Sequence, residues 1–200
     1  RAGVDALTRV VEACRDFGVK VLSVYTFSTE NYQRSDKECQ FIFDLVTKFA
    51  KEKINDFKKN NVKLIVSGDL EYSEKLTAKT KESLMSAVNA TKDCDGYILN
   101  LCFSYGGKHE IVQAVNKLIK SGVSKITEQD IENNLYTAGI PHPDLIVRAS
   151  GEHRLSNFLL WQSAYAEFYF PTTHWPDFDR EIVKECILEY QKRNRRFGNV

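Results

Sequence analysis

The strongest constraint on the fold is an alternation, along the whole chain, of short apolar runs with segments of helical periodicity. Runs such as Val19–Phe27 and Gly96–Tyr105 are continuously apolar, which is typical of strands that are buried on both faces. The segment Ser35–Phe57 instead carries apolar residues three and four positions apart, the spacing of one helix face. Strands that alternate with helices predict an α/β fold with a mostly parallel central sheet flanked by helices.

The same patterns predict the remaining elements. Further strands are expected at Val62–Asp69, Asp144–Ser150 and Glu167–Phe170, and helices at Ala2–Phe17, Ser73–Thr91, Lys108–Lys120, after Thr127 and at Asp179–Arg195. Since no linker, repeat or low-complexity stretch interrupts them, we expect one domain over residues 1–200. The first helix begins without a capping residue, so we expect a further segment upstream of it.

Composition and charge exclude several classes of function. The 28 Lys and Arg residues face 27 Asp and Glu residues, so a nucleic-acid binder that relies on bulk positive charge is excluded and any anion site must be local. A hydrophobic content of 42% excludes a disordered chain. No apolar run approaches the roughly 20 residues of a membrane span, and the start lacks a secretory signal, which predicts a soluble, cytoplasmic protein.

The cysteines and histidines show no metal or hydrolase pattern. The five cysteines are widely spaced without a CxxC pair, and they indicate reduced thiols rather than a zinc site or a disulfide framework. The four histidines lack metal-binding spacing and no GxSxG motif is present, so we expect the histidines to be structural or solvent-facing.

Ligands of such folds bind beyond the carboxyl ends of the strands, so the segments that follow the strands hold the candidate site. The first, Ser28–Arg34, contains hydroxyl, carboxylate, amide, aromatic and guanidinium groups, but it is equally compatible with a polar turn before a helix capped by Ser35 or Asp36. The third strand is followed by Gly106-Gly107, which fits a tight turn better than a phosphate loop because the P-loop spacing is missing.

The segment after the fourth strand favours an anion site. Arg148 and Arg154 lie six residues apart around a Ser-Gly turn, and guanidinium groups bind phosphate oxygens bidentately. Ion pairing to Glu152 is the alternative, although one carboxylate cannot neutralise two arginines.

Two further candidates lie near the end of the chain. Glu167 follows an apolar stretch and is either salt-bridged or a ligand of a hard metal such as Mg²⁺. The basic tail that contains Arg196 and Gly198 is either a solvated helix end or a third phosphate contact.

Five segments resemble, in order and spacing, the motifs of the cis-prenyltransferases, the family of undecaprenyl and dehydrodolichyl diphosphate synthases. They are YTFSTENYQR (25–34), NLCFSYGGKHEI (100–111), DLIVRASGEHRLSNFLLWQSAYAEFYF (144–170), WPDF (175–178) and RRFG (195–198). The resemblance covers essentially the whole chain. It implies a cis-prenyltransferase-like fold with a hydrophobic tunnel, which the apolar face of the Phe41–Phe57 helix could line unless that face is packed core.

The resemblance implies an Mg²⁺-dependent condensation of isopentenyl diphosphate onto an allylic diphosphate such as farnesyl diphosphate. It implies a proton acceptor at Asn31 and a magnesium ligand at Glu167. It implies substrate binding at two groups of residues and at the C-terminal RxG element: Ser28, Thr29, Glu30, Tyr32 and Arg34 for the allylic substrate, Arg148, Arg154, Leu155 and Ser156 for isopentenyl diphosphate, and Arg196 with Gly198.

The family also implies a homodimer, with a heteromer with a related subunit as the alternative, and peripheral contact with a membrane, which is the endoplasmic reticulum in a eukaryote. The chain lacks a counterpart of the family's aspartate motif, so we expect it to be inactive alone in this form. Tyr32, Ser104 and Lys108 stand where Trp, Asn and Arg are common. A noncatalytic partner subunit and a phosphate-binding module without chemistry are the competing interpretations, although such a partner is expected to lose the arginine set that this chain keeps.

Overall fold

The computed structural model describes residues 2–194, which form two compact units. One unit comprises Lys20–Ile140, and the other comprises residues 2–19 with residues 141–194. Arg196 and Gly198 of the predicted RxG element lie outside the described residues. No helix in the described range is long and apolar enough to cross a membrane.

The unit Lys20–Ile140 contains a three-stranded parallel sheet in the order β1-β3-β2. Strand β1 (Val21–Ser28) pairs with β3 (Tyr97–Tyr105) from Val21 opposite Ile98, and β2 (Val62–Ser67) pairs with β3 from Val62 opposite Tyr97. The central strand β3 is almost wholly buried, in accordance with its continuous apolar sequence. Since all three strands are parallel, their carboxyl ends share one edge of the sheet.

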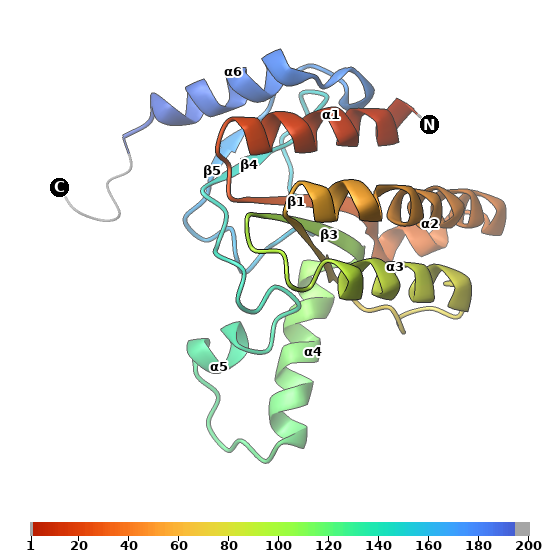
Figure 1. Ribbon diagram of the computed structural model, residues 1–200. Helices are drawn as coiled ribbons and strands as arrows, with labels where there is room; N and C mark the ends of the chain where they lie inside the picture. Colours follow the sequence, from red (N-terminus) through yellow and green to blue (C-terminus); the bar gives the residue numbers. More distant parts are fainter. Residues whose placement is uncertain (1, 195–200) are drawn as a thin grey trace. The chain divides into compact units, whose positions relative to one another are not determined.

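Helices join these strands as the periodicity predicts. The helices α2 (Asp36–Lys59) and α3 (Ala78–Ala90) lie side by side and both contact β2, and α4 (Gly107–Lys120) begins directly after β3 and contacts the short α5 (Glu128–Glu132) (Figure 1). Ser35 and Glu38 form a capping box at the start of α2, so the predicted cap at Ser35 is confirmed.

The predicted start of one helix is wrong. α3 begins at Ala78 rather than at Ser73, because the Thr77 side chain accepts a hydrogen bond from the Thr80 backbone N–H and thereby caps the helix at that point. The residues before Thr77 form turns, including a hydrogen bond from the Leu76 N–H to the Ser73 carbonyl.

The other unit contains a second parallel ladder of two short strands, β4 (Leu145–Val147) and β5 (Glu167–Tyr169), with Leu145 opposite Glu167. Helices α1 (Ala2–Asp16) and α6 (Arg180–Gln191) pack against each other in this unit (Figure 1). The mixed α/β class with parallel strands and flanking helices is therefore confirmed, with the strands divided between two sheets.

The core of the unit Lys20–Ile140 is strongly aromatic beneath the carboxyl end of β1. Phe27, Phe43 and Phe103 are almost completely buried, and their ring centroids lie 5.2–5.9 Å apart in edge-on or tilted contacts. Part of the apolar face of α2 is therefore packed core. Its Ile42, Leu45, Val46 and Ile54 side chains are only half-buried, and Phe41 is exposed.

Candidate functional site

The segment after β1 forms a short 3-10 helix, η1 (Thr29–Gln33), that is capped at its first residue. The Ser28 hydroxyl accepts a hydrogen bond from the Asn31 N–H, and the Asn31 side-chain oxygen accepts one from the Ser28 N–H at 3.0 Å. Ser28 and Thr29 are buried, whereas Glu30 and Arg34 are exposed. The predicted allylic-substrate residues therefore form one rigid turn with two outward-facing charged groups.

Tyr32 has a mainly supporting position in this turn. Its ring is buried and lies 4.8 Å from the ring of Phe27, and its hydroxyl donates to the Ser104 hydroxyl at 3.0 Å. Burial raises the pKa of Tyr32 above its usual value, so the phenol remains a neutral donor near neutral pH. The Ser104 hydroxyl in turn donates to the Asp69 carbonyl at 2.6 Å, and this links the ends of β1, β2 and β3.

Asp69, which the sequence interpretation did not select, follows β2 at the same edge of the sheet. One carboxylate oxygen lies 2.8 Å from His109 Nε2, and the other accepts a hydrogen bond from the Glu71 N–H at 2.9 Å. The His109 ring also meets the Tyr72 ring edge-on at 4.8 Å. The rule that ligands lie beyond strand ends could have selected Asp69, because it follows β2 by two residues.

The glycines after β3 prove to be part of a helix start. Gly106 is the N-cap of α4 with an extended φ of −155°, a conformation that any residue adopts. The neighbouring Glu110 is almost completely buried, where it accepts hydrogen bonds from the Tyr105 hydroxyl and from the Tyr136 N–H. The helix expected after these glycines is present, and the buried Glu110 carboxylate joins its first turn to β3 and to Tyr136.

The arginine-bearing segment after β4 lies in the other unit, where its side chains bond one another and its backbone bonds the segment after β5. The Arg148 guanidinium donates to the Ser156 hydroxyl at 2.7 Å and to the Arg154 carbonyl at 2.8 Å, while Arg154 forms an ion pair with Glu152. The turn contains several residues with positive φ, namely Ser150, Gly151, Ser156, Asn157 and Leu159. The structure thus brings Arg148, Arg154 and Ser156 together, with Leu155 half-buried between them.

Glu167 lies at the opposite end of the β4–β5 ladder from Arg148. It faces Leu145, whereas the Arg148 N–H bonds the Tyr169 carbonyl beyond the last ladder pair. Its carboxylate forms an ion pair with Arg193 at 2.7 Å, which is the salt-bridge alternative that the sequence left open. Among residues 2–194, no group of three or more His, Cys, Asp and Glu side chains could hold a metal ion.

The histidines have structural partners in the described range, as predicted for them. His109 contacts Asp69, His153 stacks on Phe170 at 4.7 Å, and His174 Nδ1 lies 3.0 Å from the Ser150 hydroxyl.

The fold and these side chains define an α/β protein with two polar clusters beyond its strands, one of them carrying two arginines. The family model described as putative undecaprenyl diphosphate synthase matches residues 1–198. The chain therefore belongs to the undecaprenyl diphosphate synthase family of cis-prenyltransferases, and it is a transferase.

Individual relatives agree with this family. The chain is 46% identical over 211 residues to an isoprenyl transferase of Streptococcus pneumoniae and 41% identical over 206 residues to one of Clostridium perfringens, covering 82% and 80% of those proteins and all of this chain.

Two solved structures share the fold. A probable undecaprenyl diphosphate synthase of Campylobacter jejuni is 37% identical with a TM-score of 0.87, over 99% of this chain and 92% of that one. Lavandulyl diphosphate synthase of Lavandula x intermedia, in complex with dimethylallyl diphosphate, is 28% identical with a TM-score of 0.91, over 99% and 87%.

Proposed function

We propose that this protein elongates an allylic diphosphate, such as farnesyl diphosphate, with isopentenyl diphosphate to give a long-chain polyprenyl diphosphate with cis double bonds. Family membership supports prenyl transfer, and the arginine cluster after β4 is the observation that carries the substrate assignment. Arg148 donates to the Ser156 hydroxyl and to the Arg154 carbonyl, whereas the Glu152 carboxylate forms an ion pair with Arg154. A diphosphate would therefore find unneutralised positive charge there.

The capped turn after β1 is proposed to bind the allylic diphosphate. Arg34 supplies positive charge at the end of η1, and the Ser28 and Thr29 hydroxyls lie at its start. In the reaction, the bond between the allylic carbon and its diphosphate breaks, a carbon–carbon bond to isopentenyl diphosphate forms, and a proton leaves the latter. Positioned donors stabilise the departing diphosphate most where its charge develops.

Asn31 is proposed as the group that receives this proton. Its side-chain oxygen already accepts the Ser28 N–H, and since a carbonyl oxygen has two lone pairs, one acceptor position is left on it. The capping box fixes the orientation of this oxygen, and this pre-positioning is what the proposed role needs.

Glu167 fits Mg²⁺ by the chemistry of its donor. Mg²⁺ prefers oxygen ligands and is commonly held by one or two carboxylates together with substrate phosphates, so Glu167 would supply one protein ligand. Bound magnesium would supply positive charge against the diphosphate leaving group. Arg193, which pairs with Glu167, holds the carboxylate in a defined orientation.

A hydrocarbon product also needs an apolar surface. We propose that the half-buried side chains of α2, such as Ile42, Leu45 and Val46, contact the growing chain. Each added five-carbon unit would contribute about 3–4 kcal/mol of binding free energy, at about 0.8 kcal/mol per buried CH₂ group. Release of long products would then be slow and is proposed to occur toward a membrane.

The test supplies farnesyl diphosphate, labelled isopentenyl diphosphate and Mg²⁺ to the full natural protein, alone and with any partner subunit that copurifies with it. We expect labelled polyprenyl diphosphate from the protein alone, as a homodimer. Product only in the presence of a partner would replace the self-sufficient enzyme by a heteromer, and absence of product in both arms would contradict the proposal.

A further inference from the structure

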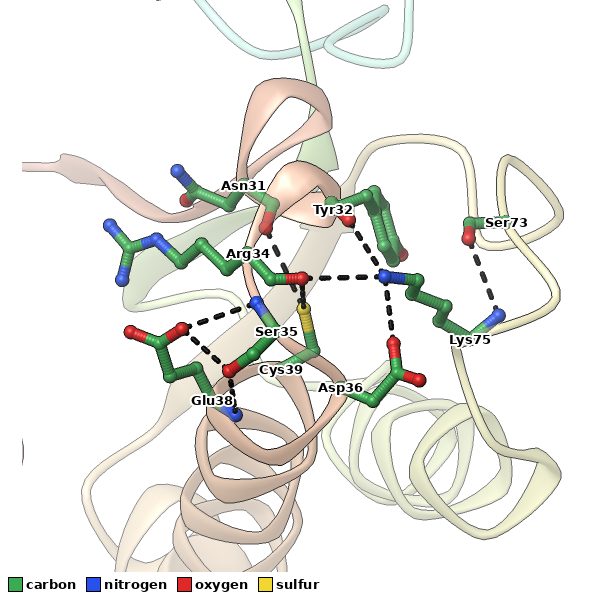
Figure 2. Close-up of polar contacts among 9 residues, drawn as sticks. All are labelled: Asn31, Tyr32, Arg34, Ser35, Asp36, Glu38, Cys39, Ser73 and Lys75. Atoms are coloured by element: carbon green, nitrogen blue, oxygen red, sulfur yellow. Dashed lines mark hydrogen bonds and ion pairs between the residues drawn. The ribbon is translucent and has the colours of Figure 1, made fainter.

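The Lys75 ammonium group has an unusual set of partners, all of them from the segment Tyr32–Asp36 (Figure 2). It donates to the Tyr32 carbonyl at 3.0 Å and the Arg34 carbonyl at 3.3 Å, and it lies 2.8 Å from Asp36 Oδ1. A lysine side chain has three N–H donors and no acceptor. Each donor of Lys75 therefore has an acceptor within the protein, and this cation is not a ligand for a phosphate group.

The carbonyl groups that Lys75 contacts lie where η1 ends and α2 begins. The last carbonyls of a helical turn lack partners within the helix and carry partial negative charge, so a cation is favourable there. The Cys39 thiol also approaches the carbonyls of Asn31 and Arg34, at 3.6 and 3.8 Å. Side chains outside η1 thus fix the path of the backbone at this junction.

Lys75 is itself held by the segment Asp69–Lys75. Its backbone N–H donates to the Ser73 hydroxyl at 3.3 Å, and the Asp69 N–H donates to the Ser104 carbonyl at the end of β3. Between these points the Tyr72 ring stacks on the Tyr32 ring at 5.6 Å. The segment that carries Lys75 is therefore held against the end of β3 and the Tyr32 ring, and this defines the position of the lysine side chain.

We propose that Lys75 is a positioning residue that fixes the Tyr32–Asp36 backbone so that the Arg34 guanidinium is presented to the allylic diphosphate. In Figure 2 the Arg34 side chain extends away from Lys75, while its carbonyl oxygen faces the ammonium group. Within residues 2–194, the Arg34 guanidinium forms no ion pair or hydrogen bond. This inference rests on the proposed function of the turn.

We expect the ion pair with Asp36 to contribute less to the position of this backbone than the carbonyl contacts of Lys75 do. The Asp36 side chain is 86% exposed, and ion pairs that reach solvent contribute little. The contact with the Tyr32 carbonyl is partly buried, and this carbonyl loses its lysine donor when the ammonium is removed. Lys75→Met should therefore have a larger effect than Asp36→Asn.

The experiment compares Lys75→Met with Lys79→Met, Asp36→Asn and Lys75→Arg in the full natural protein. Lys79 is exposed on α3, and its side chain has no hydrogen bond or ion pair with a described residue, so it controls for loss of one positive charge. For Lys75→Met we expect the KM for farnesyl diphosphate to rise about ten-fold, as for a lost charge-assisted hydrogen bond, with the KM for isopentenyl diphosphate unchanged. Lys75→Arg, which keeps the charge and donors, should recover part of the loss.

A second measurement does not require turnover. Hydrogen exchange at the backbone amides of residues 31–38 should be about ten-fold faster in Lys75→Met and unchanged in Lys79→Met. Unchanged exchange in Lys75→Met, a wild-type KM for farnesyl diphosphate, or an equal rise of both KM values would overturn the positioning role. If the wild-type protein elongates no allylic diphosphate, the proposed function fails, and exchange alone then decides whether Lys75 fixes this backbone.

Discussion

The turn after β1 and the arginine-bearing turn after β4 differ in what holds them in place. The first is fixed by residues far along the chain, since Lys75, Ser104 and Tyr72 all contact the segment Ser28–Asp36. In the second, Arg148 bonds the Arg154 carbonyl and the Ser156 hydroxyl within eight residues, and backbone hydrogen bonds join Ser150 and Gly151 to the segment after β5.

Because of this difference, we expect the two turns to contribute unequally to the free energy of unfolding and to substrate binding. Substitutions that disturb the turn after β1 should change folding as well as substrate use, because its contacts belong to the core of the sheet edge. Substitutions in the exposed arginine turn should change substrate use with little effect on folding. Four variants examine this contrast and the surrounding sheet edges, and their expected effects decrease from Gly68→Ala to Tyr169→Phe.

Gly68→Ala should have the largest effect, and on stability. Gly68 has a φ of +150°, and a Cβ there would lie 1.9 Å from the Phe103 carbonyl oxygen. Strain and overpacking together should lower the free energy of unfolding by about 3–5 kcal/mol, measured by urea denaturation. Gly122→Ala is the matched control, since Gly122 also has a positive φ (+78°) but no atom within 4 Å of the Cβ position. Equal decreases in the free energy of unfolding in the two variants would refute the role of the close approach of Gly68 to the Phe103 carbonyl.

Arg154→Ala should instead affect catalysis. Loss of one charge-assisted pair with a diphosphate costs about 1.5–3 kcal/mol, so kcat/KM for isopentenyl diphosphate should fall about ten- to hundred-fold. The free energy of unfolding should stay close to that of wild type, because the Arg154 side chain is 59% exposed. Lys184→Ala, which removes an exposed charge on α6 in the same unit, serves as the control. Unchanged kinetics would contradict the assignment of this cluster.

Tyr32→Phe should destabilise the protein by a smaller amount than Gly68→Ala. The substitution keeps the buried ring but removes the hydroxyl that donates to Ser104, which leaves the Ser104 oxygen without that donor. We expect a loss of about 1 kcal/mol in the free energy of unfolding. Tyr72→Phe is a suitable control, because the Tyr72 ring is half-exposed and its ring stacking on Tyr32 is retained. A loss no larger than that of the control would argue against the link between Tyr32 and Ser104.

Tyr169→Phe should show the smallest effect, and only through pH. A hydrogen bond to the Glu185 carboxylate raises the pKa of Tyr169 from 10.0 to about 12. Since the folded pKa is raised, this bond stabilises the fold fully below pH 10, and its contribution disappears as the pH rises from 10 to 12. Thermal unfolding of wild type and Tyr169→Phe between pH 8 and 12 measures the difference. If the two proteins still differed in thermal stability at pH 12, the hydrogen bond between Tyr169 and Glu185 would not be the cause of the difference.

Much of the site was predictable because its signals are local. Ser28 and Asn31 lie three residues apart, and so do Ser35 and Glu38, so each capping box depends on one short segment of sequence. The arginine cluster was predictable for the same reason, since Arg148, Arg154 and Ser156 fall within nine consecutive positions. The ion pair of Glu167 with Arg193 spans 26 residues, and the sequence could only name it as one of two alternatives.

The amino-acid sequence sufficed to predict the parallel α/β class, the capped start of α2 and the residue types that follow each strand, although it misplaced the start of α3. The tertiary structure was needed to show that Lys75 contacts the carbonyls of Tyr32 and Arg34, which lie 43 and 41 positions earlier in the chain. It was also needed to show that Asp69 contacts His109. Periodicity and capping act over a few residues, whereas these contacts depend on the strand order β1-β3-β2, which places the ends of β2 and β1 on either side of β3. The sequence around Lys75 does not indicate which backbone carbonyl groups its side chain contacts in the folded protein.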